Sequence, residues 1–482
     1  MSRGWFHSPL DAADALVYKM DLMIRRILSS FHPRNQPWIT RQSYCHELIV
    51  ALTYPAALAM IEGGVVGVLA RKTFGVGPML FAAIMSAPMF ANLTSFLWAR
   101  LSRRRRKVRF INVLQVAFLL TVGSIALLPT GGAGPLLLVG LVIVARVLQT
   151  GILTVRSTIW RLNYPRPVRA RVTGRLAIIN SLLMAVAPLA GYAFLDRDPD
   201  AFRLIYPASV LIALIGVGAF SRVRLRGERE LLRYESDPAA RPVPHGAPAP
   251  LYEYDPEVPA SGFWSILRRD HLFRRYLQWQ FVAGLALMIA DVIVIHLIVD
   301  LTSSLRFAYV TSITLTTALP MLLAVLTLPF WARYFDRVHI VRLRMRLGPL
   351  WLLSLLLNWF AVQFGSLPVL VAARIVVGFY RGAGALAWNL GHNDFADRRL
   401  VALYMGIHVT LTGVRGAIGP FLAMALYIGW SERALLWLGI EVPAFKGISH
   451  HVFLLSAALV VVATAGFYHL DHAIRRGRPS GA

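Results

Sequence analysis

Twelve long apolar stretches restrict the fold of this chain more than any other feature of the sequence. Each is close to the ~20 residues that a helix needs to cross the hydrocarbon core of a bilayer. Hydrophobic residues make up 57% of the chain and charged residues 15%, and this apolar share exceeds the roughly 45 to 50% of soluble domains. We therefore expect an all-α membrane protein with twelve transmembrane helices. The stretches are 48–70, 78–98, 110–128, 136–153, 176–195, 205–220, 281–299, 307–330, 350–364, 368–390, 403–428 and 453–468.

A short motif near the end of the second stretch returns in the second half of the chain. Residues 96–107 read FLWARLSRRRRK, and residues 330–337 read FWARYFDR. Arg146 and Arg374 also match, each following an alanine and preceding a tryptophan by 14 positions. Matches in the same order at a nearly constant offset indicate a duplication. The sequence therefore predicts two pseudo-symmetric six-helix bundles, as in secondary transporters built from internal repeats.

Arginine and lysine gather in alternate loops between the stretches. Because such residues favour the cytoplasmic side, both termini are expected in the cytoplasm. The prediction is an N-terminal amphipathic segment (1–47), a first bundle (48–221), a cytoplasmic linker (222–274), a second bundle (275–470) and a cytoplasmic tail (471–482). Seven prolines between positions 238 and 259, among charged residues, indicate that this part of the linker buries no core.

The net charge of +26 raises nucleic acid as a partner for a soluble protein. Here the arginines are explained by loop orientation, so we expect no nucleic-acid binding, and we expect a monomer in the lipid bilayer. Cys45 is the single cysteine and excludes an intramolecular disulfide or a cysteine metal cluster. No motif of a hydrolase, metalloprotease or phosphate loop is visible, so neither enzyme activity nor a cofactor is expected.

These features resemble the major facilitator superfamily, whose members have two six-helix halves and a signature, G-x-L-a-D-R-x-G-R-R, between helices two and three. Residues 95–104 keep its leucine and arginines and replace both glycines and the acidic residue, while the second copy keeps an aspartate. The resemblance implies alternating access. It also implies a gating role for the charged residues of the two copies, which are Arg100, Arg103, Arg333 and Asp336.

Charged side chains inside membrane helices cost about 2.5 to 3.5 kcal/mol each on the insertion scale and need partners or water. Six lie within the predicted spans: Glu62, Asp291, Arg146, Arg374, Arg381 and Arg415. The four arginines are candidates for binding an anionic substrate, since guanidinium groups match carboxylate and phosphate oxygens. Glu62, Asp291 and His408 are candidates for proton coupling. The alternatives are ion pairs that fix helix packing and, for His408, a satisfied core histidine.

The sequence thus predicts a secondary transporter of a small solute in the cell (inner) membrane, with an organic or phosphorylated anion as the favoured cargo. Two alternatives stay open: a non-transporting receptor or assembly factor on the same fold, and a multidrug exporter with an aromatic-lined cavity. A metal site at His392 and Asp394 is a further alternative to a helix cap at the end of the tenth span.

Overall fold

The computed structural model describes residues 29–236, 263–396, 401–431 and 443–476. These residues are almost entirely helical, and the one β-type pairing among them is the bridge between Trp430 and Phe445. The predicted amphipathic helix before residue 28 and the proline-rich part of the linker lie outside the described residues. A short 3₁₀ turn, η1 (Pro33–Asn35), precedes the first span.

The first half contains six spans. They are α2 (Trp38–Thr53) with α3 (Pro55–Met60) and α4 (Gly63–Lys72); α5 (Pro78–Asn92) with α6 (Ser95–Leu101); α7 (Lys107–Ser124) with η2 (Ile125–Leu127); α8 (Gly134–Asn163); α9 (Arg166–Leu195); and η3 (Pro199–Ala201) with α10 (Phe202–Phe220).

The second half repeats this order. Its spans are α13 (His271–Leu301); α14 (Ala308–Ile313) with the π-helix η4 (Thr314–Ala318) and α15 (Leu319–Phe335); α16 (Ile340–Gln363); α17 (Leu367–Leu390) with η5 (Gly391–Asp394); α18 (Val401–Ile428); and η7 (Ser449–His451) with α19 (Val452–Arg476).

Eleven helices among the described residues are long and apolar enough to cross a membrane, and α5 with α6, bent by 45°, brings the number to twelve. Large apolar side chains point outward from several of them; Leu120, Leu211 and Leu326 are 67%, 66% and 74% exposed. In water such exposure would cost free energy, whereas in a bilayer these side chains meet lipid tails. The predicted all-α membrane fold is confirmed.

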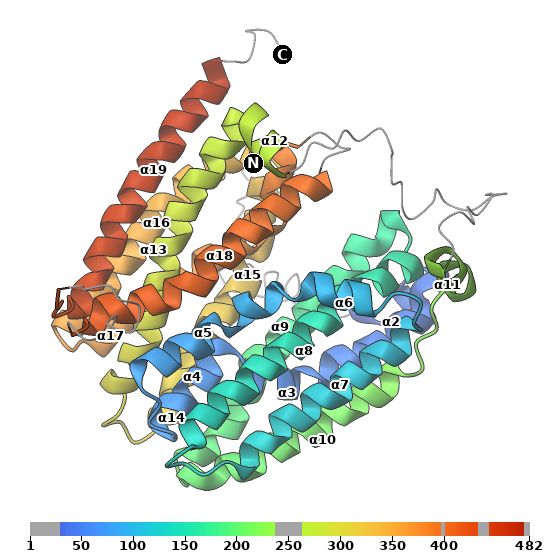
Figure 1. Ribbon diagram of the computed structural model, residues 1–482, viewed down its shortest axis with the longest axis horizontal. Helices are drawn as coiled ribbons and strands as arrows, with labels where there is room; N and C mark the ends of the chain where they lie inside the picture. The colour runs from blue at the N-terminus through green and yellow to red at the C-terminus, as the bar shows by residue number, and fades with distance from the viewer. Residues whose placement is uncertain (1–28, 237–262, 397–400, 432–442, 477–482) are drawn as a thin grey trace, which may run out of the picture.

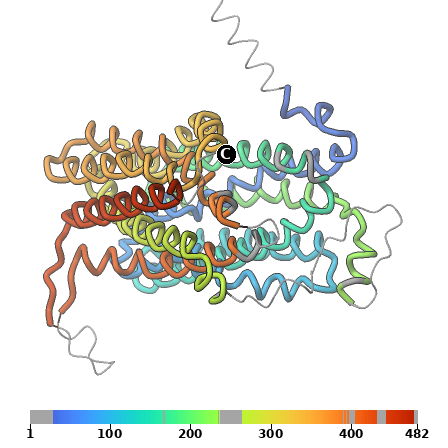
Figure 2. The backbone as a smooth tube through the Cα atoms, turned by 90° about the horizontal axis from the view of Figure 1, so that it is seen from above, coloured from blue at the N-terminus to red at the C-terminus, as the bar shows by residue number. Residues whose placement is uncertain are grey.

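The two halves form separate sets of helices, blue to green and yellow to red, on opposite sides of the view in Figure 2. They touch through α5 against α18, α9 against α14 and α15, and α4 against α13. The halves approach each other where α4 and α14 lie and diverge towards the end that carries α11 (Glu228–Ser236) and α12 (Phe263–Arg269) (Figure 1). We call these the outer end and the inner end, after the orientation that the sequence predicts.

The repeated tryptophans occupy equivalent helices. Trp98 lies in α6 of the second span and packs against Gly151 of α8, where an added Cβ would lie 2.8 Å from its ring. Trp331 lies in α15 of the eighth span, and its indole N–H donates to the Phe379 carbonyl of α17 at 2.6 Å. Arg146 and Arg374 lie on those same fourth and tenth spans. The duplication inferred from the sequence is thus visible as equivalent packing.

Two short helices lie between the halves. α11 (Glu228–Ser236) follows the sixth span, and α12 (Phe263–Arg269) precedes the seventh, where apolar residues predict a short interfacial helix. Glu235 of α11 binds Lys107 Nζ at 2.7 Å and accepts from the Arg104 backbone N–H at 2.7 Å. Arg104 has φ +58°, a left-handed conformation at the sharp turn into α7. The start of the predicted linker is therefore docked on the first half.

Candidate functional site

The first span is interrupted in its middle, and Glu62 stands at the interruption. Glu62 has extended backbone angles (φ −64°, ψ 139°), α3 ends before it, and α4 begins at Gly63. Two successive glycines have low helix propensity and weaken the helix here. The break releases the Ile61 carbonyl, which accepts a hydrogen bond from Arg146 Nη2 at 2.5 Å. The same nitrogen pairs with Glu62 Oε2 at 3.2 Å.

The second half contributes an opposing group of charges. Glu62 interacts electrostatically with Arg381 of α17 as well as with Arg146. Arg374, about two helical turns before Arg381 on α17, is 3% exposed and interacts with Asp291 of α13. Its Nε and Nη1 are buried without a hydrogen-bond partner. Arg381 and Asp291 are exposed, although both lie well inside predicted spans.

We call Glu62, Arg146, Asp291, Arg374 and Arg381 the central cluster. Five of the seven substrate or proton candidates from the sequence thus come together between the halves. Three guanidinium groups in this cluster face two carboxylates, so the cluster carries one excess positive charge when all five are ionised. An uncompensated charge in a low-dielectric site favours an anionic ligand.

The backbone adds to this preference. The broken first span directs the N-terminus of α4, with its partial positive charge, to the middle of the protein. Opposite it lies the π-helix of the eighth span: Thr316 Oγ1 lies 3.5 Å from the Gly64 carbonyl, and an added Cβ at Gly64 would lie 2.2 Å from Thr317 Oγ1. π-Helical turns are frequent at functional sites because they free backbone groups.

Arg415 and His408 lie apart from the central cluster. Arg415 of α18 packs on the backbone of α13: its Nη1 donates to the Gln280 carbonyl at 2.7 Å, and Gly284 leaves room for its guanidinium. His408 contacts the Trp388 ring at 6.1 Å between centroids and interacts with Arg344, Arg415 and His392. These residues form a second group within the second half, near its inner end.

The four gating candidates lie at the inner ends of the second and eighth spans, Arg100 and Arg333 in the last turns of α6 and α15 and Arg103 and Asp336 just after them. Arg100, Arg103, Arg333 and Asp336 are all exposed, and none makes an ion pair with another described residue. The polar contact that holds this loop in the first half is instead Lys107 with Glu235, which the sequence analysis did not single out. Lys107 is 2% exposed.

Polar contacts join the halves at the outer end. Arg71 pairs with Asp300 at 3.3 Å, and Thr73 bonds the Tyr309 hydroxyl at 3.1 Å. The Asp196 carboxylate accepts hydrogen bonds from the Tyr309 and Val310 backbone N–H groups at 2.7 and 3.0 Å. An aspartate of the first half thereby caps α14 of the second half, which satisfies N–H groups that have no partner within the helix. The outer ends are held together in this conformation.

A buried network in the first half was missed by the sequence analysis. Glu47 is fully buried and accepts from Arg156 Nη2 at 2.8 Å, Trp160 Nε1 at 2.6 Å and the Tyr164 hydroxyl at 3.2 Å. Glu47 stands just before the first apolar stretch, and its partners lie on the polar end of α8 and beyond. The four-residue spacing of Arg156 and Trp160 on one helix face is the available sequence signal.

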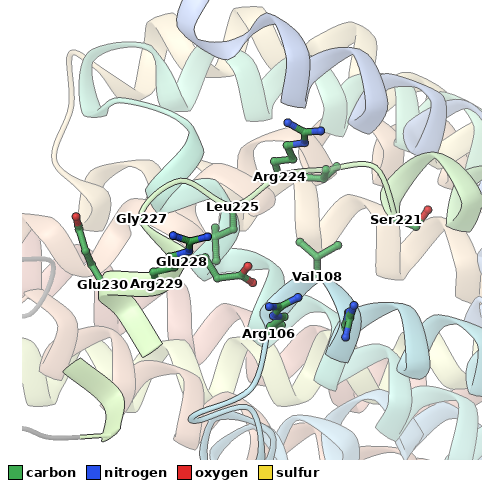
Figure 3. A pocket seen from close by; sticks show the side chains of 11 residues that line it. Arg106, Val108, Ser221, Arg224, Leu225, Gly227, Glu228, Arg229 and Glu230 are labelled. Carbon is green, nitrogen blue, oxygen red and sulfur yellow. The ribbon is translucent and has the colours of Figure 1, made fainter. Parts of the chain in front are cut away.

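An open hollow of about 550 Å³ lies on the inner face of the first half (Figure 3). Arg106 and Arg109 at the start of α7 line it together with Arg224 and the first turn of α11. It contains none of the charged residues of the central cluster. We therefore separate it from the candidate transport site.

Asp394 acts as a helix cap. Its Oδ2 accepts a hydrogen bond from the Ile340 backbone N–H at the start of α16, at 2.6 Å. Burial lowers the pKa of the nearby His392 from its ordinary value. Among the described residues no group of three or more histidine, cysteine, aspartate or glutamate side chains could hold a metal ion.

The chain was compared with known proteins. Residues 48–420 match the family model of the Major Facilitator Superfamily. No curated protein matches. Among solved structures, the nucleoside transporter NupG is 12% identical with a TM-score of 0.63, covering 90% of this chain and 99% of that one.

Two further solved structures share the fold. A POT family transporter in complex with 5-aminolevulinic acid is 13% identical with a TM-score of 0.61, and 91% of this chain covers 97% of it. The inward-open xylose transporter XylE from E. coli is 12% identical with a TM-score of 0.54, and 89% of this chain covers 95% of it. The family match extends over most of the chain, and the fold is that of multi-pass membrane transporters rather than of enzymes. This protein belongs to the major facilitator superfamily.

Proposed function

We propose that this protein is a secondary active transporter of a small organic or phosphorylated anion. The observation that carries the proposal is the central cluster, in which Arg374 is buried with two unpartnered donors while three guanidinium groups face two carboxylates. A carboxylate or phosphate group would supply the missing acceptors and neutralise the excess charge. The N-terminus of α4 points to the same place and favours the same charge.

Glu62 is the proposed proton-coupling residue, with Asp291 as the second. Glu62 interacts with Arg146 of its own half and with Arg381 of the other half. Protonation of Glu62 would remove an attraction between the halves and release Arg381 for the substrate. The Glu62 carboxylate and an anionic substrate would then compete for the same guanidinium groups, so that proton binding to Glu62 and anion binding would favour each other.

The structure corresponds to an inward-facing state in this proposal, in a monomer located in the cell (inner) membrane with both termini in the cytoplasm. The outer ends touch through Arg71, Asp300 and Asp196, while the inner ends diverge (Figure 1). Alternating access requires the inner ends to approach each other in the opposite state. The exposed Arg100 and Arg103 of the first half and Arg333 and Asp336 of the second are the proposed contacts of that inner gate.

The test is uptake into proteoliposomes of a panel of labelled organic acids, sugar phosphates, neutral sugars, nucleosides and cations, with and without an imposed proton gradient. We expect saturable uptake of an anion that a proton gradient drives. Uptake confined to neutral solutes or cations would refute the anion assignment. Absence of uptake for the whole panel, with correctly folded protein, would favour the alternative of a non-transporting receptor.

A multidrug exporter is the second candidate, and it differs in the chemistry of the central site. Its cargo would be bulky and apolar and would need an aromatic-lined cavity. The described residues at the centre are mainly charged or hydroxyl side chains: Glu62 before α4, the charged residues of α8, α13 and α17, and the threonines of the π-helix. The aromatic residue that interacts with this cluster, Tyr380, also carries a hydroxyl group. Dye efflux by reconstituted protein would nevertheless distinguish the two functions directly.

A further inference from the structure

Near the inner end of the second half, α13, α16, η5 and α18 meet around a second group of basic side chains. Arg344 of α16 and Arg415 of α18 are 9% and 7% exposed, and His408 of α18 is 3% exposed. Arg415 interacts electrostatically with Arg344, and His408 interacts with both arginines. We call Arg344, Arg415 and His408 the basic triad.

Each member of the basic triad has a buried nitrogen without a hydrogen-bond partner. These atoms are Nε of Arg344, Nε of Arg415 and Nε2 of His408. Arg415 uses Nη1 on the Gln280 carbonyl, which is a neutral acceptor. Buried polar groups are almost always satisfied, so three unsatisfied nitrogens close together require an explanation.

The groups that face the two arginines are neutral: the centre of the Trp351 ring lies 5.9 Å from Arg344 Cζ, and the buried Tyr276 hydroxyl interacts with Arg344 and Arg415. The ion pairs among the described residues include neither Arg344 nor Arg415. Two aspartates at the inner ends of these elements bind other groups. Asp394 caps α16 at Ile340, and Asp270 caps α13 at Phe273 and accepts from the Tyr404 hydroxyl.

Two buried guanidinium groups that repel each other without a counter-charge are unfavourable, because burial removes the water that would solvate them. Arginine does not escape this cost by losing its proton. The chain does provide a place for the charge: Gly284 lacks a side chain where Arg415 packs, since an added Cβ would lie 1.8 Å from Nη1. The arginine is therefore held in the interior by the shape of α13 rather than pushed out towards water.

We propose that the basic triad, whose three side chains are buried within the second half, is a binding site for one small inorganic anion and is distinct from the central cluster. The anion accepts hydrogen bonds from the unpartnered nitrogens of Arg344, Arg415 and His408. It links α16 to α18 and, through Arg415, to α13. Because the anion stabilises the bundle itself, the proposal does not depend on which solute the protein transports.

The experiment measures thermal unfolding of the full-length protein in detergent at constant ionic strength. The buffer anion is gluconate, which is too large for an enclosed site, and chloride or inorganic phosphate replaces it stepwise. We expect the Tm of the unaltered protein to rise by a few °C and to saturate with one of the two anions. A rise with chloride alone assigns a halide site, and a rise with phosphate alone assigns an oxyanion site.

Variants locate the effect. Arg344→Leu and Arg415→Leu should lose the anion-dependent rise, and His408→Leu should weaken it. The matched control is Arg342→Leu on the same helix, because Arg342 pairs with Asp471 at 3.5 Å outside the triad and should keep the rise. If a leucine variant does not fold, anomalous scattering from bromide in crystals of the unaltered protein tests a halide at the triad directly.

A Tm that responds equally to gluconate, chloride and phosphate would overturn the proposal. So would loss of the rise in Arg342→Leu, since the response would then not belong to the triad. Transport activity is not measured in any arm. Failure of the anion site and failure of the proposed transport function are therefore separate results.

Discussion

Replacing Arg374 tests most directly whether the central cluster binds an anion. In the structure its Nε and Nη1 are buried and have no partner, so both are available to a ligand. A hydrogen bond to a charged group contributes about 1.5 to 3 kcal/mol. Two such bonds contribute about 3 to 6 kcal/mol, and each 1.4 kcal/mol is a tenfold change in affinity. We therefore expect Arg374→Ala to raise Kd for the transported anion by roughly 10² to 10⁴-fold.

Arg374→Lys should give an intermediate loss of anion affinity, because an ammonium keeps the charge but cannot present two donors in the geometry of a guanidinium. Arg146→Ala should reduce the anion affinity less than Arg374→Ala, because Nη2 of Arg146 already donates hydrogen bonds to the Ile61 carbonyl and to Glu62. Equilibrium binding of labelled anion to detergent-solubilised protein gives Kd, and size-exclusion profiles report folding. Arg342→Ala, in a pair with Asp471 away from the cluster, is the control. A folded Arg374→Ala protein with unaltered anion affinity would refute the reasoning.

Three further outcomes follow from the contacts. Glu62→Gln should abolish dependence of uptake on the proton gradient and retain substrate exchange; unchanged proton dependence would move the coupling to another group. Glu47→Ala should lower the free energy of unfolding by about 3 to 5 kcal/mol, measured by thermal or denaturant unfolding, because it leaves a buried guanidinium without its partner. Gly64→Ala should slow transport, since its Cβ would lie 2.2 Å from Thr317 Oγ1 and oppose contact between the halves. Gly77→Ala meets nothing within 4 Å and should transport normally, so equal rates for the two alanine variants would contradict this packing argument.

The fold could be predicted from the sequence because membrane insertion depends on local composition. Each apolar stretch must satisfy its own backbone hydrogen bonds in lipid, so length and hydropathy suffice to place it. The helices extend beyond the apolar stretches at their inner ends: α8 continues to Asn163 and α13 begins at His271. Those extensions are polar or charged, and hydropathy does not distinguish them from loops.

The membership of the site was partly predictable. An ionisable residue inside a span costs free energy wherever it points, so the sequence identified Glu62, Arg146 and Arg374 without knowledge of the packing. The direction in which a side chain of a span points depends on how that helix packs against its neighbours. Arg374 and Arg415 therefore looked alike in the sequence, although one joins the central cluster and the other packs on α13.

Other features gave no adequate signal. The π-helix in the eighth span has an ordinary apolar and threonine composition, and its wider turn contacts the broken first span at Gly64. Glu47 was assigned to the cytoplasmic segment because it precedes an apolar stretch. Its partners Arg156 and Tyr164 lie 109 and 117 positions away, and only the fold brings such distant groups together.

The placement of polar contacts separates what must stay rigid from what must move. Within the first half, Glu47 is fully buried with Arg156, and breaking such a pair costs several kcal/mol. Between the halves, Arg71 and Asp300 have side chains 20% and 50% exposed, and pairs of this kind contribute about 0 to 1 kcal/mol.

A transporter needs inward-facing and outward-facing states that differ by only a few kcal/mol, so that substrate and proton can shift the balance. The weak, water-accessible pair of Arg71 with Asp300 at the outer end meets that need, and the buried pairs within the first half favour its movement as one body. Glu62 takes part in both kinds of contact, because it pairs with Arg146 of its own half and is attracted by Arg381 of the other half. In the proposed mechanism, a change in the protonation of this one carboxylate therefore acts on the contact between the halves.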